Sequence, residues 1–452
     1  MNIIIIGCGK VGEVLASQLN EKSNDITVVD ENADKVKAIV NKYDVMGVIG
    51  NGTTGATLTE AGISSADLVI AVTGDDEINL LACVLAKKAG NCLTIARVKN
   101  PEHYADAAKL KNDLSISMII NPEYAAASEI SRILNFPSAI NVETFAKGRI
   151  ELLKFKLPEG SRLVGMKVKE VITKLRCNIL VCTVERGDEA LVANGDLEFC
   201  ERDTISIIAS RRTALNFFKK IDHKLDNVDN AIIVGGDGIT HYLCELMNRS
   251  GIKLKVIEKD RKKCELLAAK FDSVTVMCGD PTDEQVLREE GVANADAFIS
   301  LTSLDEENIL LSLFAKRAGS KKSVTKINRI EYDDVIKQLD LDSIVYPKHL
   351  TANMILKYVR SYNNNRGSSM ENLYNIIKGQ VIAAEFAVGE YSPISGTQIS
   401  ELRLKPDVLI AAILRDKQLI IPRGQDVITP GDSVVVVTKI QSLYDITDIL
   451  EK

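Results

Sequence analysis

The sequence predicts an α/β protein built from two tandem copies of one unit. In each copy we expect a lobe with a doubly wound parallel sheet, followed by a small β-rich α+β lobe. The first observation behind this prediction is a repeat, because Gly50 and Thr73 match Gly279 and Thr302, 229 residues further along a chain of 452. The second observation is that short apolar runs alternate with helical stretches, which indicates a parallel sheet covered on both faces.

The beginning of the first copy carries this alternation. Its apolar runs are nearly continuous, as the strands of a sheet covered on both faces require. We expect strands at 3–7, 25–30, 45–50, 67–73, 93–98 and 116–120, and helices at 10–21, 32–42, 53–62 and 77–90. The second copy repeats the opening strand and turn as "AIIVGGDGIT".

The remainder of each copy has short strands separated by turn residues, as in 178–210 and 408–439, which is typical of a small β-rich module. The polar segments 219–230 and 360–374 contain few apolar residues and are predicted to be linkers. The predicted lobes are 1–138 (Rossmann-like, nucleotide-binding), 139–222 (β-rich), 228–364 (Rossmann-like, with a degenerate glycine turn) and 371–452 (β-rich).

The composition is that of a soluble globular protein, with 46% hydrophobic and 26% charged residues and a net charge of −6. There is no basic footprint for nucleic acid and no polybasic run for a membrane surface. No apolar run is long enough to span a membrane, and the N-terminus lacks the basic region of a signal peptide. We therefore expect a cytoplasmic protein that neither binds nucleic acid nor inserts into the membrane.

Metal binding is not expected from the cysteines or the histidines. The nine cysteines contain no CxxC pair, so buried, reduced thiols are the prediction. The four histidines lack ligand spacing and are expected in surface or core roles; they are His103, His223, His241 and His349.

The opening glycine turn is the strongest functional signal. "GCGKVG" at 7–12 follows an apolar strand and opens a helix, which is the Rossmann arrangement for a dinucleotide. Gly7 permits the sharp turn, Gly9 lets backbone approach a pyrophosphate, and Gly12 lets the helix pack close to the strand. Asp30, 18 residues past Gly12, is placed to bind a ribose diol. An acid there repels a 2′-phosphate, so the prediction is NAD(H) or another adenine nucleotide. The alternative is a glycine turn with a surface aspartate.

Other residues are expected at the same edge, because ligands of such sheets bind at the carboxyl ends of the strands. Arg97 pairs either with a phosphate or with a neighbouring acid. Asp75 is the expected N-cap of the following helix, whose dipole Asp76 and Glu77 complement. The candidate cofactor-binding residues are Gly7, Cys8, Gly9, Lys10, Val11, Gly12, Asp30, Asn51, Thr53, Thr73, Gly74 and Arg97.

The second copy departs from this pattern at its turn. It keeps Gly235 but carries Asp237 and Thr240 at the positions of the second and third glycines. A carboxylate about 4 Å from a phosphate costs roughly 4 kcal/mol at an effective dielectric near 20. Glu258 still occupies the position of the ribose acid. Two alternatives follow: a vestigial pocket, which we favour, or a pocket for a ligand without a pyrophosphate at this turn.

A non-enzymatic nucleotide sensor fits the chain better than an enzyme. The duplication uses up the chain, so no unrepeated catalytic domain is left, and no GxSxG, HExxH or P-loop lysine pattern occurs. No catalytic residue is therefore predicted. The alternative is a soluble NAD-dependent oxidoreductase with its site between the two halves. A third option is a nucleotide-binding scaffold.

The chain resembles the TrkA family, the cytosolic subunits of Trk potassium uptake systems, whose halves are RCK modules (regulators of potassium conductance). The resemblance covers nearly all of the chain through "GCGKVG", Asp30 in "VVD", "GNGT", "DDEINLLACVLAKKAG" and "INPEYAAASEI". It implies that Gly7 to Gly12 hold pyrophosphate, Asp30 the adenosine ribose, and that Thr73, Gly74 and Arg97 complete the pocket.

The resemblance also implies partners and a mechanism. It implies a separate membrane pore of the TrkH/TrkG type, a homo-oligomer (dimer or tetrameric ring), and a peripheral position on the inner face of the plasma membrane. NADH and NAD⁺, or ATP and ADP, would favour different assemblies and so act on the pore. Asn121 and Pro122 are expected to open a helix that crosses to a partner lobe through Ala125, Ala126 and Ala127, or alternatively a core helix.

Overall fold

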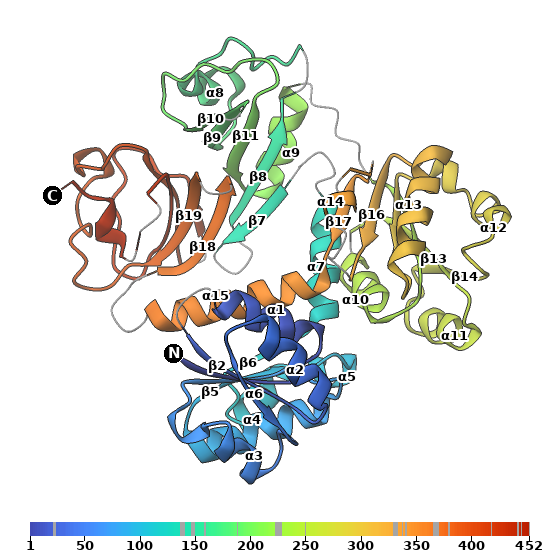
Figure 1. Ribbon diagram of the computed structural model, residues 1–452. Helices are drawn as coiled ribbons and strands as arrows, with labels where there is room; N and C mark the ends of the chain where they lie inside the picture. The colour runs from blue at the N-terminus through green and yellow to red at the C-terminus, as the bar shows by residue number, and fades with distance from the viewer. Residues whose placement is uncertain are drawn as a thin grey trace. The chain divides into compact units, whose positions relative to one another are not determined.

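The structure is a computed structural model that describes residues 1–20, 24–135, 141–145, 150–157, 160–187, 189–221, 228–248, 250–328, 333–336, 338–339, 341–364, 370–377, 380–416, 418–440, 443 and 445–451 (Figure 1). These residues form two compact units. The first unit combines Met1–Leu134 with Val228–Leu356, and the second combines Asn135–Asn227 with Lys357–Lys452. The first unit therefore holds both predicted Rossmann-like lobes, and the second holds both β-rich lobes.

The first Rossmann lobe contains a sheet of six parallel strands in the order β3-β2-β1-β4-β5-β6. The strands are β1 (Asn2–Ile6), β2 (Asp25–Asp30), β3 (Met46–Ile49), β4 (Leu68–Ala71), β5 (Leu93–Arg97) and β6 (Met118–Ile120). The central strands β1 and β4 are almost wholly apolar and buried, as the prediction of a doubly covered sheet requires, whereas the edge strand β3 is largely exposed.

Helix α4 of this lobe begins at the cap that the sequence predicts, whereas α5 and α6 were not predicted. Asp75 accepts a hydrogen bond from the Ile78 amide at 2.9 Å, so its role as N-cap is confirmed. The helices are α1 (Lys10–Asn20), α2 (Ala33–Lys42), α3 (Gly55–Glu60), α4 (Asp76–Gly90), α5 (Pro101–Ala105), α6 (Ala107–Asp113) and α7 (Pro122–Asn135), with a 3₁₀ turn at Ile63–Ser65.

The second Rossmann lobe repeats this sheet, in the order β14-β13-β12-β15-β16-β17. Its strands are β12 (Asn230–Val234), β13 (Lys253–Glu258), β14 (Val274–Cys278), β15 (Ala297–Ser300), β16 (Lys322–Lys326) and β17 (Ser343–Val345). Its helices are α10 (Gly238–Met247), α11 (Arg261–Lys270), α12 (Glu284–Glu289), α13 (Asp305–Ala318), α14 (Asp333–Ile336) and α15 (Pro347–Asn364), with a 3₁₀ turn at Val292–Asn294. The predicted duplication is therefore visible as two sheets with the same strand order.

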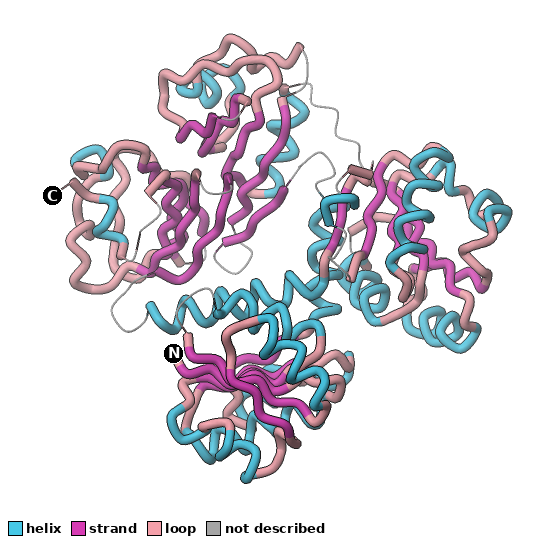
Figure 2. Tube along the Cα trace, in the orientation of Figure 1, coloured by secondary structure: helices cyan, strands magenta, loops and turns pink. Residues whose placement is uncertain are grey.

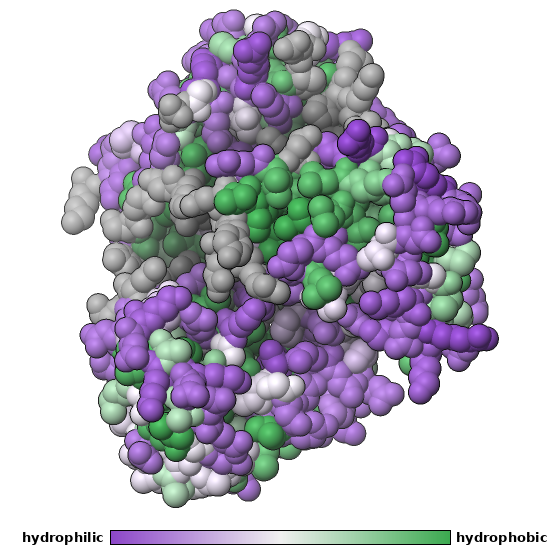
Figure 3. All heavy atoms as spheres, turned by 45° about the vertical axis from the view of Figure 1, so that its right-hand side comes forward, coloured by the Kyte–Doolittle hydropathy of each residue, from purple (hydrophilic) through white to green (hydrophobic). Residues whose placement is uncertain are grey.

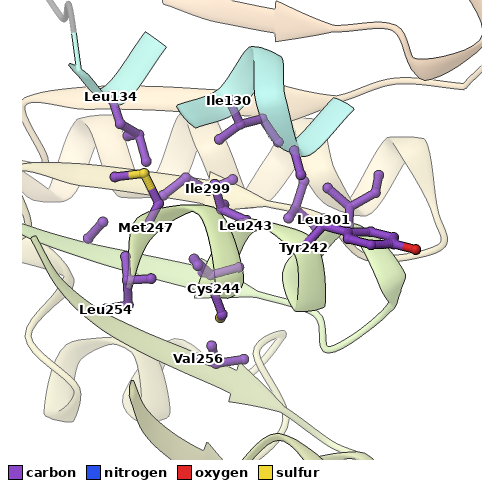
Figure 4. Packing of buried hydrophobic residues seen from close by; sticks show 14 of the residues in the cluster. Ile130, Leu134, Tyr242, Leu243, Cys244, Met247, Leu254, Val256, Ile299 and Leu301 are labelled. Carbon is purple, nitrogen blue, oxygen red and sulfur yellow. The ribbon is translucent and has the colours of Figure 1, made fainter. Parts of the chain in front are cut away.

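Helix α7 leaves the first Rossmann lobe and packs on the second one. Asn121 Oδ1 accepts hydrogen bonds from the Glu123 and Tyr124 amides at 2.9 Å, which confirms the predicted N-cap. Ala126, Ala127, Ile130 and Leu134 then lie in one apolar cluster with residues of α10 and of β12, β13 and β15. Figure 4 shows Ile130 and Leu134 above Leu243 and Met247 of α10. The expected crossing of this helix is confirmed, and the lobe that receives it belongs to the same chain.

The second unit contains two antiparallel sheets, in the orders β10-β9-β11-β8-β7 and β18-β19-β22-β20-β21 (Figure 2). Both lobes contribute to one apolar cluster, in which Phe145 and Tyr374 lie with ring centroids 4.5 Å apart. The strands are β7 (Asn141–Phe145), β8 (Ile150–Lys156), β9 (Leu180–Arg186), β10 (Glu189–Val192), β11 (Thr204–Ala209), β18 (Met370–Ile377), β19 (Val381–Ala387), β20 (Val408–Arg415), β21 (Gln418–Ile420) and β22 (Ser433–Thr438). The helices are α8 (Val168–Leu175) and α9 (Arg211–Lys220), with 3₁₀ turns at Ile399–Glu401 and Ile446–Ile449.

The predicted linkers are shorter than expected. Helix α9 continues to Lys220, α15 continues to Asn364, and β18 already begins at Met370. Polar residues do not by themselves end a helix, which explains the error. Of the lobe boundaries, 138–139 and 222–227 lie outside the described residues, and the four lobe ranges stay a prediction.

Seven of the nine cysteines are buried, and all nine are free thiols. The prediction of buried thiols is wrong for Cys278, which is exposed at the end of β14, and for Cys200, which is half-buried.

Within the described residues, no helix combines the length and the apolar character needed to cross a membrane. Hydrophilic side chains cover most of the face in Figure 3, around a broad apolar area. Leu304, which precedes α13, and Leu310, which lies within it, are among the exposed apolar residues of the described chain.

Candidate nucleotide site

The glycine turn lies at the point where the strand order of the first Rossmann lobe reverses. Strand β1 pairs with β2 on one side and with β4 on the other, so the crevice between the two following connections opens above its carboxyl end. Ligands of open α/β sheets bind at such a switch point. The turn from Gly7 to Gly12 joins β1 to α1 there.

The three glycines of the turn are in three different situations. Gly7 has a φ of +108°, and a Cβ on it would lie 2.9 Å from the Thr73 amide nitrogen. A Cβ on Gly12 would overlap the carbonyl oxygen of Gly7. A Cβ on Gly9 would meet no atom within 4 Å. Gly7 and Gly12 are therefore required by the turn itself, whereas the space over Gly9 is open to a ligand.

Asp30 holds the turn from the end of β2. Its Oδ2 accepts a hydrogen bond from the Cys8 amide at 2.7 Å, and its Oδ1 accepts one from the Asn32 amide at 2.9 Å. Burial, together with the charge of Asp30 and against that of Lys35, raises the pKa of the Cys8 thiol to about 12. Cys8 is thus a neutral, buried side chain that contributes only its backbone to the turn.

The remaining residues of the turn and of the loop after β3 lie at the same edge. Val11 is buried and Lys10 is exposed at the start of α1. Asn51 Oδ1 accepts hydrogen bonds from the Thr53 amide at 2.8 Å and from Thr53 Oγ1 at 2.5 Å. The two side chains therefore order the loop after β3. This loop is joined to Asp30 by the hydrogen bond from the Gly50 amide to the Asp30 carbonyl at 3.0 Å.

Arg97 and Thr73 meet at the ends of β4 and β5. Arg97 Nη2 donates to the Thr73 carbonyl, whereas Arg97 Nε is buried and has no hydrogen-bond partner among the described residues. Burial lowers the pKa of Arg97, against the charges of Asp76 and Glu123. Within the described part of the chain, Arg97 thus keeps a free donor near the crevice. Gly74, next to Thr73, is exposed.

Asn79 was missed by the sequence reasoning as a residue that positions the site. It is fully buried, and its Oδ1 accepts from the amide and the hydroxyl of Thr73, both at 2.8 Å. Its Nδ2 donates to the Arg97 carbonyl at 3.0 Å. Asn308 binds Thr302 and Lys326 in the same way in the second lobe. The signal was present, because a buried polar residue kept in both copies of a helix has a bonding role.

Asp76 does more than complement the dipole of α4. It is buried, and its Oδ2 accepts from the amides of Lys99 at 2.8 Å and Asn100 at 2.7 Å. The prediction for Asp76 is therefore incomplete, since this carboxylate also fixes the loop after β5. Asp305 accepts from the Asn328 amide at 2.9 Å in the second lobe.

A cavity of about 340 Å³ lies beside α1. It is lined from the first lobe by residues such as Lys10 and Glu13, and from the second lobe by Asn328, Lys348 and His349. Glu13 forms an ion pair with Lys42 at 2.8 Å. This cavity adjoins the helix that follows the glycine turn, and the lysines and carboxylate in its lining are Lys10, Lys42, Lys348 and Glu13.

The turn of the second Rossmann lobe has the same backbone and different side chains. Glu258 Oε2 accepts from the Gly236 amide at 2.5 Å, as Asp30 does in the first lobe. Thr240 Oγ1 donates to the Gly235 carbonyl, at the position of Gly12. Asp237 forms an ion pair with Lys263 at 2.5 Å, a partner that the sequence reasoning did not foresee.

The histidines of the described chain lie in different surroundings. His103 Nδ1 is 3.9 Å from Glu77, and His241 Nε2 is 2.9 Å from Lys270 Nζ. His349 lines the cavity beside α1, and His223 lies outside the described residues. No group of three or more potential ligands able to hold a metal ion is found among the described His, Cys, Asp and Glu residues.

Comparison with known proteins places the chain in a family. The model of the TrkA-N domain matches residues 3–122 and 231–347, and that of the TrkA-C domain matches residues 152–222 and 383–451. The chain belongs to the TrkA family. The TrkA protein of the Trk potassium uptake system of Haemophilus influenzae is 33% identical over 445 residues, 96% of this chain and 95% of that protein. TrkA homolog 1 of Methanosarcina mazei is 31% identical over 444 residues, 96% of this chain and 97% of that protein.

Solved RCK structures share the fold of the TrkA-family chain. The GsuK RCK domain matches 97% of this chain and 92% of its own length, with a TM-score of 0.63 and 18% identity. A GsuK channel solved with NAD bound matches 97% of this chain and 76% of its own length, with the same TM-score and identity. The predicted fold class, two Rossmann-like lobes each paired with a β-rich lobe, is therefore confirmed.

Proposed function

We propose that this chain is a nucleotide-binding regulatory subunit of a Trk-type potassium uptake system, acting on a separate membrane pore. The proposal is carried by the open glycine turn at the switch point of the first Rossmann lobe, in a chain of the TrkA family. Names of relatives across nearly the whole length support the transport context.

The ligand we propose is NAD(H), with ATP or ADP as the second candidate. The amides at the start of α1 and the open backbone at Gly9 suit a pyrophosphate. Asp30 would bind the ribose diol, and Arg97 Nε would donate to a phosphate or sugar oxygen. Thr73 and Gly74 would line the crevice between them, with Asn51 and Thr53 on the far side of Asp30. GsuK structures solved with NAD and with ADP support this ligand class.

The partner we propose is a potassium pore subunit of the TrkH/TrkG type, on the cytoplasmic face of the plasma membrane. The chain would act there as a homo-oligomer, a dimer or a tetrameric ring. A nucleotide shifts such an assembly only by its differential affinity for two arrangements, typically about 1–3 kcal/mol of coupling. Reduced and oxidised NAD, or ATP and ADP, would thereby set different pore activities.

The test is a titration followed by a flux measurement. Calorimetry with NAD⁺, NADH, ATP and ADP identifies the ligand, and potassium flux through the reconstituted pore with each ligand measures the response. We expect saturable binding of at least one nucleotide and a change in flux at the same concentration. Absence of binding by all four nucleotides contradicts the site, and binding without any change in flux contradicts the regulatory role.

We also infer that the chain regulates without catalysing a reaction. The transport names of its relatives support this, and the raised pKa of the Cys8 thiol makes it a poor nucleophile beside the turn. Incubation with NADH and a panel of keto acids is expected to leave the NADH absorbance unchanged. Steady turnover would favour the oxidoreductase alternative.

A further inference from the structure

The first residue of α10 lies against a side chain from the other Rossmann lobe. A Cβ on Gly238 would overlap Oε2 of Glu123 and lie 2.7 Å from its Cδ. Glu123 is the second residue of α7, the helix that crosses from the first lobe to the second. The carboxylate therefore lies against the first residue of α10, and glycine at 238 leaves room for it.

The start of α10 is a place where an anion is stabilised. The first amides of a helix have no intrahelical acceptor and carry a partial positive charge. The N-cap residue Asp237 makes no side-chain hydrogen bond to these amides, because it pairs with Lys263 at 2.5 Å. In a Rossmann lobe this helix start, just after the glycine turn, is where the phosphates of a nucleotide lie. The Glu123 carboxylate lies against the first residue of this helix, next to that position.

Basic residues of both lobes act on this carboxylate. The pKa of Glu123 is raised, because burial and the charge of Asp237 outweigh the charges of Lys99, Lys326 and Arg97, which act to lower it. Lys326 is 7% exposed, and its Nζ donates to the Leu301 carbonyl at 3.1 Å. Lys326 ends β16 as Arg97 ends β5, so the second lobe keeps a basic residue at the position predicted to bind phosphate in the first lobe.

The matching position in the other copy has the opposite charge. Pro122 opens α7 and Pro347 opens α15, so Glu123 corresponds to Lys348. Lys348 lines the cavity beside α1 together with Lys10, and its Nζ donates to the Asn328 carbonyl at 2.5 Å. The first lobe thus has a lysine at the position where the second lobe receives a carboxylate.

We propose that the Glu123 carboxylate is a built-in anion of the second Rossmann lobe, which occupies the position of a nucleotide phosphate at the start of α10. The second lobe then takes no nucleotide and serves as the docking site for α7 of the first lobe. This resolves the two alternatives for the degenerate turn in favour of a closed pocket. The inference does not rest on nucleotide binding by the first lobe.

The test is rescue of a truncated side chain by a small anion in the full-length chain. Glu123→Ala leaves an anion position next to Lys326 and α10, and is expected to lower the melting temperature of the first unit by roughly 2–6 °C. Phosphate or formate at tens of millimolar should restore at least half of this loss, compared with chloride at equal ionic strength. Equal effects of the three anions would overturn the proposal.

Two variants control for nonspecific stabilisation by salt. Glu129→Ala removes another carboxylate from α7, one that pairs with Arg132 on the same helix, and its melting temperature should respond equally to phosphate and chloride. Adding Gly238→Ala to Glu123→Ala places a methyl group in the vacated space, and should abolish the rescue. Phosphate rescue that persists in this double variant would show that the anion binds elsewhere, and so would overturn the proposal.

A second measurement tests the closed pocket directly. Calorimetry with NAD⁺ and with ADP on the wild-type chain should show no more than one site per chain, because the second lobe is closed. A stoichiometry of two per chain would overturn the inference. If the wild-type chain binds neither nucleotide, the proposed function fails, whereas the anion rescue still decides the role of Glu123.

Discussion

The open space at Gly9 distinguishes this glycine from its two neighbours in the turn. Gly7 and Gly12 are surrounded by backbone atoms of the turn itself, so their substitution would disturb the fold as well as the site. A Cβ at position 9 would meet no protein atom within 4 Å, so we expect a substitution there to affect what binds at the turn and not the fold. Position 9 is therefore where binding and folding can be separated by mutation.

Gly9→Asp is expected to weaken nucleotide binding about a thousandfold while leaving the fold intact. A carboxylate about 4 Å from a phosphate costs about 4 kcal/mol at an effective dielectric near 20. Calorimetry with the nucleotide that binds the wild-type chain measures the loss, and circular dichroism checks the fold. Gly389→Asp, at an equally open glycine of the second unit, should bind as the wild type does. Unchanged affinity in Gly9→Asp contradicts the assignment of the turn.

The ion pair of Arg415 with Asp432 stabilises the second β-rich lobe. Arg415 donates to both carboxylate oxygens of Asp432, at 2.9 and 2.7 Å, and Arg186 and Asp203 form the same pair in the first β-rich lobe. Burial acts to raise the pKa of Asp432, but the bonds from Arg415 and Thr429 outweigh it and hold the pKa below 3.8. The folded state therefore favours the ionised carboxylate.

Asp432→Asn is expected to lower the free energy of unfolding of the second unit by about 1.5–3 kcal/mol at pH 7. Because the folded pKa is lowered, this contribution is full above the unfolded pKa near 4 and is lost as the pH falls through the folded value. Denaturant titrations at pH 7 and pH 3 should show the gap to the wild type closing at the lower pH. Asp407→Asn, in an exposed pair 3.9 Å from Lys439, serves as control and should change little at either pH. A gap for Asp432→Asn that does not depend on pH would contradict this account.

Among the elements, α7 belongs to the first lobe by sequence and to the second lobe by packing. Its alanine run lets the helix approach α10 closely, and Tyr104, Tyr124 and Tyr242 form an aromatic cluster with ring centroids 5.3–6.1 Å apart beside it. Asn121 links these parts, because its Nδ2 donates to the Tyr242 hydroxyl at 2.8 Å. The helix is therefore held at its cap and along its apolar face.

Ala127→Leu is expected to destabilise the first unit by about 1–3 kcal/mol, whereas Ala125→Leu should cost much less. Ala127 is fully buried in the cluster with α10, so added methylene groups force the two helices apart. Ala125 is only half-buried on the same helix and has room for a larger side chain. Thermal denaturation of the two variants compares them directly. Equal losses would show that α7 does not pack as described.

At the scale of the whole molecule, the two halves of the sequence do not form two independent bodies. The first unit takes a Rossmann lobe from each half, and the second unit takes a β-rich lobe from each half. Apolar clusters join the halves in both units, through α7 in the first unit and through residues such as Phe145 and Ile377 in the second. Gene duplication therefore produced one interlocked chain.

The fragment 1–222, expressed alone, is expected to self-associate or aggregate. Its helix α7 would expose an apolar face that the second lobe buries in the full chain, and exposed apolar patches of this kind promote association. Size-exclusion chromatography with light scattering measures the mass, and co-expression with 228–452 should restore a complex of one copy of each half. A soluble, monomeric 1–222 would contradict this interdependence.

The fold was predictable from the sequence wherever a local pattern specifies it. Strand and helix alternation, the register of the repeat and the N-caps at Asp75 and Asn121 depend on residues close together in the chain. The turn from Gly7 to Gly12 and its link to Asp30 belong to the same class, because consecutive strands of a Rossmann lobe bring them together by a fixed topology. The family resemblance rests on these same residues.

Long-range contacts could not be predicted in this way. The ion pair of Asp237 with Lys263 and the contact of Glu123 with Gly238 have no signature in spacing or composition. Glu123 and Gly238 are separated by more than a hundred residues, and only the angle at which α7 crosses into the second lobe brings them together.

The sequence alone thus determined that this protein is a duplicated chain of Rossmann-like and β-rich lobes with one intact glycine turn. Those features depend on local periodicity and repeated motifs. The tertiary structure decided which lobe receives α7, which carboxylates have basic partners, and what fills the second turn. The physical reason is that packing and pairing depend on distances across the fold, which the order of residues along the chain does not reveal.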